Sequence, residues 1–310
     1  MIMTVTLNPA IDKTVIIPGF AADAVNRVQS LRLDPGGKGI NVSKSVHALG
    51  GETLAMGILG GAAGQTLQQM LDALQIPNDM VFTKSETRTN LKIVDPQLHT
   101  NTDINEAGAA VTEETLEAVW QKLAQQVKPG DTVVFAGKNP PGMGEEVLAR
   151  WIRALRQLGV RVCVDTVGRP MELALQEGPD VIKPNQEELA EIVGCSTGEP
   201  AEILAAAGKL VQQGVGLVAV SMGGDGAIFV TKEQAIRGYC PKVKVSSTVG
   251  AGDSMMAAIA HYLSQGCPLE EVARRAIAVS AATVTIDGTQ AATMELIEPL
   301  LEQVRIEPIG

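Results

Sequence analysis

Aromatic and basic residues are both scarce in this chain. Tryptophan, tyrosine and phenylalanine make up 3% of the 310 residues, although 45% of the residues are hydrophobic. The core must therefore be built from aliphatic side chains, which is typical of helices layered on a parallel sheet. Lysine and arginine number 25 against 35 acidic residues, which gives a formal net charge of -10. This balance argues against general nucleic-acid binding, which needs a basic face to displace phosphate counterions.

Cysteine, histidine and long apolar stretches are also sparse. The four cysteines show no C-x-x-C spacing and the three histidines are scattered, so we expect neither a zinc site nor a disulfide scaffold. The first residues lack the charged and apolar regions of a signal peptide, and no segment approaches the roughly 20 apolar residues of a spanning helix. We therefore expect reduced thiols, a cytoplasmic location and no membrane partner.

Short apolar runs alternate with helical patterns along the chain. The runs predict strands at about 2–7, 53–58, 132–136, 160–165, 179–183 and 216–221. Apolar residues at helical spacing predict helices over 113–127 and 145–158. This alternation predicts an α/β fold with a mainly parallel sheet, helices on both faces and a ligand site beyond the carboxyl ends of the strands. Because α/β domains of this size are common, we expect a single domain over residues 1–310.

Two segments break this alternation, at about 11–34 and 86–105. Both contain runs of alternating character, such as 14–17 (T-V-I-I) and 90–94 (N-L-K-I-V). Such runs are typical of half-buried strands. We therefore expect extra strands outside the main sheet, which form a small β lid inserted within the domain.

The run 247–255 (S-T-V-G-A-G-D-S-M) is a glycine turn that leads into a predicted helix. Such a turn exposes backbone N–H groups at the positive end of a helix dipole, which suits the charge on a transferring phosphoryl group. Asp253, in the first helical turn, can accept a proton from a substrate hydroxyl. The alternative interpretation is that Asp253 only complements the dipole and the glycines only permit the turn.

A second glycine-rich run, 36–43 (G-G-K-G-I-N-V-S), also opens a predicted helix. Its spacing differs from the G-x-x-x-x-G-K-[ST] of a P-loop. The glycines let a ligand approach the backbone, while Lys38 and Asn41 offer donors to phosphate or sugar hydroxyls. The alternative is an ordinary glycine-rich helix entry.

Two further motifs follow predicted strands. In the run 181–188 (V-I-K-P-N-Q-E-E), Asn185 and Glu188 are three positions apart and can face one Mg²⁺ ion or its waters. The alternative is that Asn185 caps the helix and Glu188 completes a capping box. The run 221–227 (S-M-G-G-D-G-A) forms a tight turn that can pass under a nucleotide or simply join two strands.

Together these motifs resemble the ribokinase-like PfkB carbohydrate kinases over essentially the whole chain. The resemblance rests on 6–12 (T-L-N-P-A-I-D), 36–42 (G-G-K-G-I-N-V) and 248–255 (T-V-G-A-G-D-S-M). These runs are most similar to the phosphosugar branch, which contains 1-phosphofructokinase, tagatose-6-phosphate kinase and the minor type of 6-phosphofructokinase. The resemblance implies a ribokinase-like fold, ATP and Mg²⁺ as cofactors, a sugar phosphate as substrate, and a homodimer formed through the lid.

The resemblance also implies roles for individual residues. Asp253 is expected to be the catalytic base, with an anion hole at Gly250, Ala251 and Gly252. The residues expected to bind the substrate are Asp12, Gly37, Lys38, Asn41 and Arg88, with Arg27 lent by a neighbouring subunit. Those expected to contact ATP are Lys183, Asn185, Ser221, Gly223 and Gly226. Glu188 is expected to hold Mg²⁺ through water.

One position departs from the family pattern. Relatives often read S-G-S-L-P-P-G where this chain has A-G-K-N-P-P-G at 136–142, so that Lys138 stands in place of a serine near the substrate phosphate. A lysine keeps the attraction to phosphate as a point charge, although its longer stem can reshape the pocket.

The expected function is ATP-dependent phosphorylation of fructose 1-phosphate to fructose 1,6-bisphosphate. The run 102–106 (T-D-I-N-E) resembles 1-phosphofructokinases more than the other members of the branch. Tagatose-6-phosphate kinase and 6-phosphofructokinase remain alternatives. A sugar-phosphate sensor on the same fold is a further alternative, against which an intact Asp253 and Glu188 argue. A Rossmann dehydrogenase is disfavoured because no G-x-G-x-x-G follows the first strand.

Overall fold

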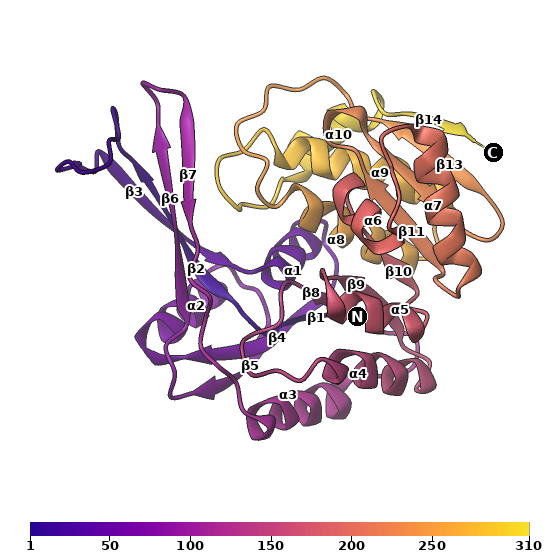
Figure 1. Cartoon of the computed structure of the whole chain (residues 1–310), viewed down its shortest axis with the longest axis horizontal. Coiled ribbons are helices and arrows are strands. Elements are labelled where there is room, and N and C mark those ends of the chain that lie inside the picture. Colours follow the sequence, from indigo (N-terminus) through magenta and orange to yellow (C-terminus); the bar gives the residue numbers. More distant parts are fainter. Residues whose placement is uncertain (310) are drawn as a thin grey trace.

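The computed structural model of the protein describes residues 1–309. Within them, the main sheet has ten strands in the order β14-β13-β12-β11-β10-β9-β8-β1-β4-β5 (Figure 1). The strands that pair in parallel are β1 (Ile2–Thr6), β4 (Thr53–Gly60), β5 (Asn78–Thr83), β8 (Thr132–Ala136), β9 (Arg161–Asp165), β10 (Val181–Ile182) and β11 (Leu217–Ser221). One edge is antiparallel and consists of β12 (Ala227–Val230), β13 (Ala235–Tyr239) and β14 (Arg305–Pro308).

The α/β fold with a mainly parallel sheet, predicted from the sequence, is confirmed. Every predicted strand is present close to its predicted residues, and the two predicted helices are α3 (Glu113–Gln126) and α4 (Glu146–Gln157). The sequence did not reveal β5 or the antiparallel edge. A stretch as short as β12, directly after a turn, has no periodicity that distinguishes a strand from a buried helical segment.

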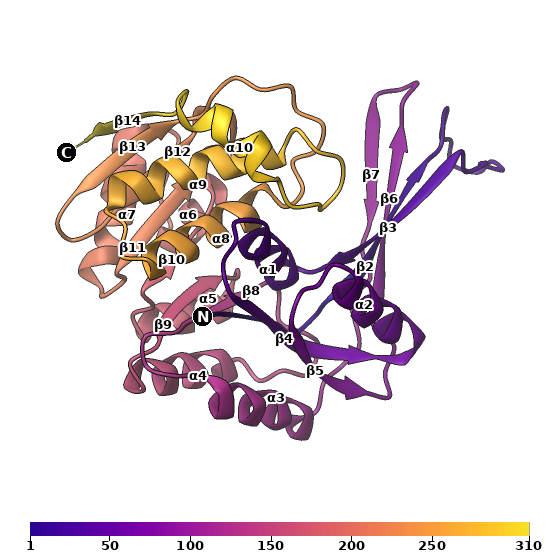
Figure 2. The same ribbon diagram turned by 180° about the vertical axis from the view of Figure 1, so that it is seen from behind.

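Helices cover both faces of the main sheet, as the two opposite views show (Figures 1 and 2). One apolar core joins the sheet to α3, α4, α5 (Arg169–Gln176), α6 (Gln186–Val193) and α7 (Pro200–Gln212). The cores on the other face join it to α1 (Lys38–Ala48), α2 (Gly61–Ala73), α8 (Ala251–Ser264), α9 (Leu269–Thr283) and α10 (Met294–Leu301). No helix within residues 1–309 is long and apolar enough to cross a membrane.

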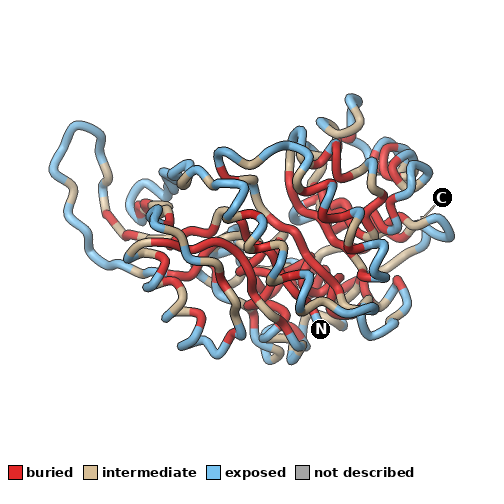
Figure 3. Tube along the Cα trace, turned by 90° about the horizontal axis from the view of Figure 1, so that it is seen from below, coloured by how far each residue is buried: buried red, intermediate tan, exposed pale blue. Residues whose placement is uncertain are grey.

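A second, four-stranded sheet stands away from the main sheet, at the left of Figure 1. This lid sheet has the order β3-β2-β6-β7 and consists of β2 (Ala10–Ile16), β3 (Ser30–Gly36), β6 (Arg88–Asp95) and β7 (Thr100–Ile104). Its outer part is exposed (Figure 3), whereas Ala10, Ile11 and Pro35 at its root are buried. The extra β strands predicted outside the main sheet are therefore present, and they overhang the carboxyl ends of the central strands.

Candidate active site

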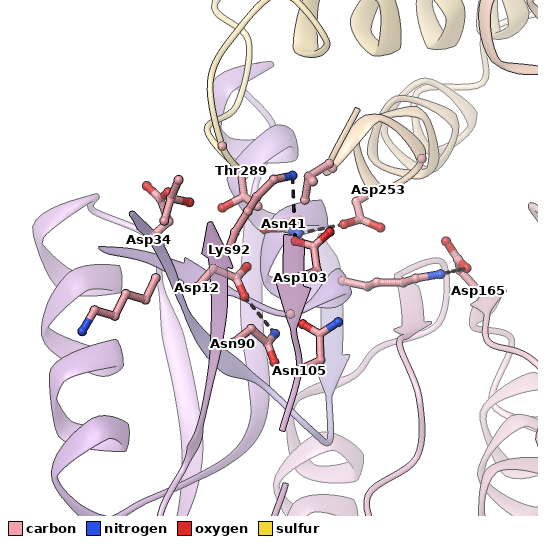
Figure 4. A pocket seen from close by; sticks show the side chains of 18 of the residues that line it. Asp12, Asp34, Asn41, Asn90, Lys92, Asp103, Asn105, Asp165, Asp253 and Thr289 are labelled. Carbon is pink, nitrogen blue, oxygen red and sulfur yellow. Dashed lines mark hydrogen bonds and ion pairs between the residues drawn. The ribbon is translucent and has the colours of Figure 1, made fainter. Parts of the chain in front are cut away.

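A cavity of about 520 Å³ lies between the lid sheet and the carboxyl ends of the central strands. The main sheet contributes Asp165 at the end of β9, Lys183 just after β10 and Ser221 at the end of β11. The start of α1 and the start of α8 complete its floor, and strands β2, β6 and β7 of the lid form its other wall (Figure 4). The cavity thus occupies the position where parallel α/β sheets bind ligands.

Asp253 lies in this cavity, in the first turn of α8. The turn before it depends on Gly250, which caps the helix at φ 81°, a left-handed conformation that favours glycine. The Ala251 N–H reaches the Thr248 carbonyl at 3.4 Å, but within the described residues the N–H groups of Gly252 and Asp253 have no backbone carbonyl to accept them. These two N–H groups are therefore available to an anion at this end of α8.

The Asp253 carboxylate is buried, with 7% of the residue exposed. Its Oδ2 accepts a hydrogen bond of 2.8 Å from Asn41 Nδ2, which Figure 4 shows pointing at it from α1. Burial and, to a smaller extent, the nearby negative charge of Asp165 together raise the pKa of Asp253 to about 6, against the opposing effects of the Asn41 hydrogen bond and of Lys38 and Lys183. A carboxylate with this pKa is mostly ionised at neutral pH and is still basic enough to accept a proton.

Asp12 and Asn90 form a second polar group on the lid side of the cavity. Asn90 Nδ2 donates to Asp12 Oδ1 at 3.0 Å, across the β2–β6 pair. The other Asp12 oxygen lies 2.1 Å from the position that a Cβ on Gly36 would take, so only glycine fits there. The buried carbonyl oxygens of Asn41 and Asn90 have no hydrogen-bond partner within the described residues. A ligand with hydroxyl donors would satisfy both oxygens.

Three charged groups meet on the main-sheet side of the cavity. Asp165, which is 2% exposed, accepts a 2.7 Å hydrogen bond from Lys38 Nζ, and Lys183 Nζ lies 3.5 Å from its second oxygen. Burial alone would raise the pKa of Asp165, but the positive charges of Lys183 and Lys38 outweigh it, so the pKa lies below its ordinary value. Lys183 Nζ is also 3.0 Å from the position of a Cβ on Gly252, which places an ammonium group against the α8 turn.

Lys44 is a buried cation at the root of the lid. Its Nζ donates to Pro35 O at 2.9 Å, to Thr289 O at 2.6 Å and to Thr289 Oγ1 at 3.1 Å. Burial lowers the pKa of Lys44 to about 8, although Asp34 and Asp12 oppose this shift. Lys44 therefore ties α1 to the first lid hairpin and to the loop that follows α9.

Comparison with known proteins assigns this architecture. Residues 5–296 match the family described as pfkB family carbohydrate kinase. The chain belongs to this family.

Individual relatives of this pfkB-family kinase match over almost its whole length. A 1-phosphofructokinase of Rhodobacter capsulatus is 38% identical over 309 residues, covering 99% of this chain and 98% of that protein. The ATP-dependent 6-phosphofructokinase isozyme 2 of Escherichia coli is 34% identical over 291 residues, covering 93% and 94%. The crystal structure of phosphofructokinase-2 from Escherichia coli in complex with substrates and products superposes with a TM-score of 0.94 at 32% identity, covering 97% of this chain and 98% of that one.

Asn185 and Glu188, the pair expected to serve Mg²⁺, form a capping box at the start of α6 in this kinase. Glu188 N–H donates to Asn185 Oδ1 at 2.8 Å, and Asn185 N–H donates to Glu188 Oε2 at 2.9 Å. Both residues also line the cavity. Residues 1–309 contain no group of three or more His, Cys, Asp and Glu side chains that could hold a metal by itself. The two residues therefore do form the helix cap that the alternative interpretation predicts, and Glu188 also lines the cavity.

Arg88 lies in the cavity wall with its donors engaged by backbone. Its Nη2 and Nε donate to Asn8 O at 3.0 and 3.3 Å, and its Nη1 donates to Glu106 O at 2.9 Å. Burial lowers the pKa of Arg88, although Asp12 and Glu106 oppose this shift. In this conformation the guanidinium is held rigidly at the junction of lid and main sheet, with donor capacity left for a ligand.

Several residues expected at the site do not line the cavity. Gly223 lies in the short 3-10 turn at Gly223–Asp225 and Gly226 follows it, between β11 and β12. Lys138 is exposed after β8, and Arg27 is exposed in the hairpin between β2 and β3. Ala251, the first residue of α8, adjoins the cavity without lining it. The other predicted site residues all line it, namely Asp12, Gly37, Lys38, Asn41, Arg88, Lys183, Asn185, Glu188, Ser221, Gly250, Gly252 and Asp253.

Sequence reasoning missed Asp165, Asn90 and Lys44. Asp165 ends a predicted strand, so the rule that ligands bind at the carboxyl ends of parallel strands would have indicated it. Asn90 lies in the alternating run of the lid. The sequence does not tell which face of that strand points into the cavity, because this depends on its pairing with β2. Lys44 follows the second glycine motif on α1, and its burial depends on Thr289, which is far away in the chain.

Proposed function

We propose that the protein transfers a phosphoryl group from ATP to the C6 hydroxyl of fructose 1-phosphate, which gives fructose 1,6-bisphosphate and ADP. The observation that carries the phosphotransfer is Asp253, a buried carboxylate with a raised pKa that lies in the cavity at the amino end of α8. The choice of fructose 1-phosphate is supported by the 1-phosphofructokinase of Rhodobacter capsulatus and by further relatives with the same name at 37%, 32% and 33% identity.

In the proposed reaction, Asp253 removes the proton of the attacking hydroxyl. The hydrogen bond from Asn41 fixes the orientation of its carboxylate, and the second oxygen is left to face the substrate. The free N–H groups at the start of α8 lie directly beside it and can stabilise the charge on the transferring phosphoryl group. Lys38 and Lys183 add positive charge at the same point. Because phosphoryl transfer needs little covalent chemistry from the protein, position and charge account for the catalysis.

Membership of the family supports ATP as the phosphoryl donor, and we propose that ATP binds together with Mg²⁺. One oxygen of Glu188 accepts the Asn185 N–H, which leaves the other outside the capping box. A single carboxylate suits Mg²⁺, because this ion keeps several waters and takes one or two carboxylates together with substrate phosphates. Glu188 would therefore hold the ion through water, and the ion would neutralise charge on the nucleotide phosphates. Ser221 in the cavity and the Gly223–Gly226 turn beside it would contact the nucleotide.

The sugar phosphate would lie between the lid and α1. Asp12 would accept from sugar hydroxyls, while the unpartnered carbonyl oxygens of Asn41 and Asn90 would accept further hydroxyl protons. Arg88 lines the cavity at the start of β6 and would offer its remaining donor capacity to the substrate phosphate. Lys138 adds a second cation on the exposed side after β8.

We also propose that two copies associate through their lid sheets. The lid exposes large apolar side chains, among them Leu31 (53% exposed), Leu33 (40%) and Ile104 (52%), and solvent-exposed apolar patches mark interaction surfaces. In such a dimer Arg27 would reach the site of the neighbouring subunit. Light scattering at micromolar concentration would report a dimer, and a fully active monomer would refute the shared lid.

We further propose one domain over the whole chain, with the lid inserted in it, and a cytoplasmic location.

The substrate assignment is tested by a coupled assay of ADP release with fructose 1-phosphate, fructose 6-phosphate and tagatose 6-phosphate. The proposal predicts the highest kcat/KM for fructose 1-phosphate. A preference for one of the other two sugar phosphates would replace the substrate but keep the reaction. ADP release with none of the three, from a folded protein that binds ATP, would refute the proposed function.

A further inference from the structure

Asp165 is the charged centre of the cavity, and neither the family motifs nor the mechanism above uses it. It ends β9, with its carboxylate 2% exposed. Figure 4 shows it among the side chains that line the same cavity as Asp253. A carboxylate buried to this degree is costly unless its charge is compensated. The compensation comes from two lysines.

The two lysines reach Asp165 from different parts of the chain. Lys38 is the first residue of α1 and approaches Oδ1 at 2.7 Å, whereas Lys183 follows β10 and lies 3.5 Å from Oδ2. Among residues 1–309, no other carboxylate lies within the 4.0 Å limit of an ion pair to either ammonium. Asp165 therefore determines where both flexible side chains lie.

The position of Lys183 coincides with the α8 turn, and Lys38 lines the same cavity. Lys183 Nζ lies 3.0 Å from the position of a Cβ on Gly252, next to the residue proposed as base. Both lysines lower the pKa of Asp253, whereas burial and Asp165 itself raise it, so these three charges all act on the Asp253 carboxylate. A lysine side chain is long and flexible, so holding its ammonium group at one point costs conformational entropy. A buried carboxylate that already holds the ammonium group in place meets this cost before the reaction, so the charge is in position when the phosphoryl group passes.

We propose that Asp165 is a positioning residue for phosphoryl transfer, which holds Lys38 and Lys183 at the amino end of α8 where the transferring phosphoryl group passes. This inference rests on the proposed kinase function. Asp165 touches neither the hydroxyl nor the phosphoryl group in this scheme and acts through the two lysines. Its negative charge has a second effect, because it lies beside Asp253 and favours the protonated form of that base.

The test uses Asp165→Asn, which keeps the shape of the side chain and removes its charge. We expect kcat to fall by about 10²–10³-fold, the loss seen when a single group that stabilises transition-state charge is removed, with a smaller change in the KM for fructose 1-phosphate. The acid limb of the kcat–pH profile should move to lower pH by about one unit, because a like charge beside Asp253 is gone. A titration of Asp253 by carboxyl NMR in the ligand-free variant should show the same shift without any turnover.

A double-mutant cycle with Lys38→Met tests whether Asp165 acts through the lysines. Residues that act as a unit are not additive, so Asp165→Asn should cost much less kcat in the Lys38→Met background than in the wild type. Asp180→Asn is the matched control. Asp180 also contacts β9, where its carboxylate accepts the Val162 N–H at 2.8 Å. It lies before β10, however, at the opposite end of that strand from Lys183. It should leave kcat and the pH profile unchanged.

Three outcomes would overturn the positioning role. They are native kcat in Asp165→Asn, full additivity with Lys38→Met, and a defect that raised Mg²⁺ concentration removes, which would indicate a metal contact instead. If Asp165→Asn does not fold, Asp165→Glu replaces it: the charge and the pH midpoint should persist while kcat falls, and native kcat would refute the inference. Wild-type turnover is measured first, so an inactive wild type refutes the proposed function separately.

Discussion

Replacing Asp253 with asparagine should stabilise the protein at neutral pH while it destroys activity. The carboxylate is buried, and its pKa is about 6 in the folded protein against an ordinary value of 3.8. The folded state therefore binds more protons than the unfolded chain between these two values. It follows that the wild type loses stability as the pH rises from about 4 to above 6, and that a neutral asparagine does not.

The size of the effect follows from the difference between the two pKa values. About two pKa units correspond to roughly 3 kcal/mol at 1.36 kcal/mol per unit. The Asn41 hydrogen bond to the charged carboxylate is weakened in the variant, so we expect a net gain of about 1–3 kcal/mol. For a chain of this size that is a rise in Tm of roughly 2–6 °C at pH 8.

The assay is a series of thermal melts of ligand-free wild type and Asp253→Asn from pH 4 to pH 8. The difference in Tm should be largest at pH 8 and close to zero at pH 4. Asp225→Asn, an exposed aspartate in the turn after β11, is the control and should show no such pH dependence. A variant that melts below the wild type at pH 8 would refute the reasoning, because it would mean that the charge stabilises the fold at the helix end.

Three further predictions concern the cavity. Gly36→Ala places a Cβ 2.1 Å from Asp12 Oδ2 and should raise the KM for the sugar phosphate about tenfold or more. Gly208→Ala, in open space on α7, is the control and should leave this KM unchanged. A Gly36→Ala variant with the wild-type KM would contradict the role of Asp12. Arg88→Ala should raise the KM for the sugar phosphate far more than that for ATP, and equal effects on both would remove Arg88 from the phosphate site. In the wild type, kcat should fall about tenfold per pH unit below about 6, because Asp253 must be ionised; a midpoint near 4 would contradict its raised pKa.

The sequence was sufficient for those parts of the molecule that local patterns determine. Aliphatic runs located the parallel strands, and the glycine turns located both helix starts that meet in the cavity. Gly250 shows why this works, since a left-handed residue before a helix requires a glycine that can be read directly from the chain.

The sequence was insufficient where function depends on contacts between distant residues. Asp165 gains its importance from Lys38 and Lys183, which only the folded chain brings to it, from the start of α1 and from the end of β10. The pair Asn185 and Glu188 left two interpretations open, and the structure shows that they are compatible, because the capping box occupies only one Glu188 oxygen. The exposure of Lys138 and Arg27 likewise depends on loop paths that no periodicity describes.

The most direct test of the central claim is the turnover of Asp253→Asn with fructose 1-phosphate and ATP, measured beside the Kd of each ligand by calorimetry. General-base assistance is worth about 10²–10⁴-fold, so we predict that kcat falls by that factor while both ligands still bind. A folded variant that binds both ligands and turns over at nearly the wild-type rate would contradict the account.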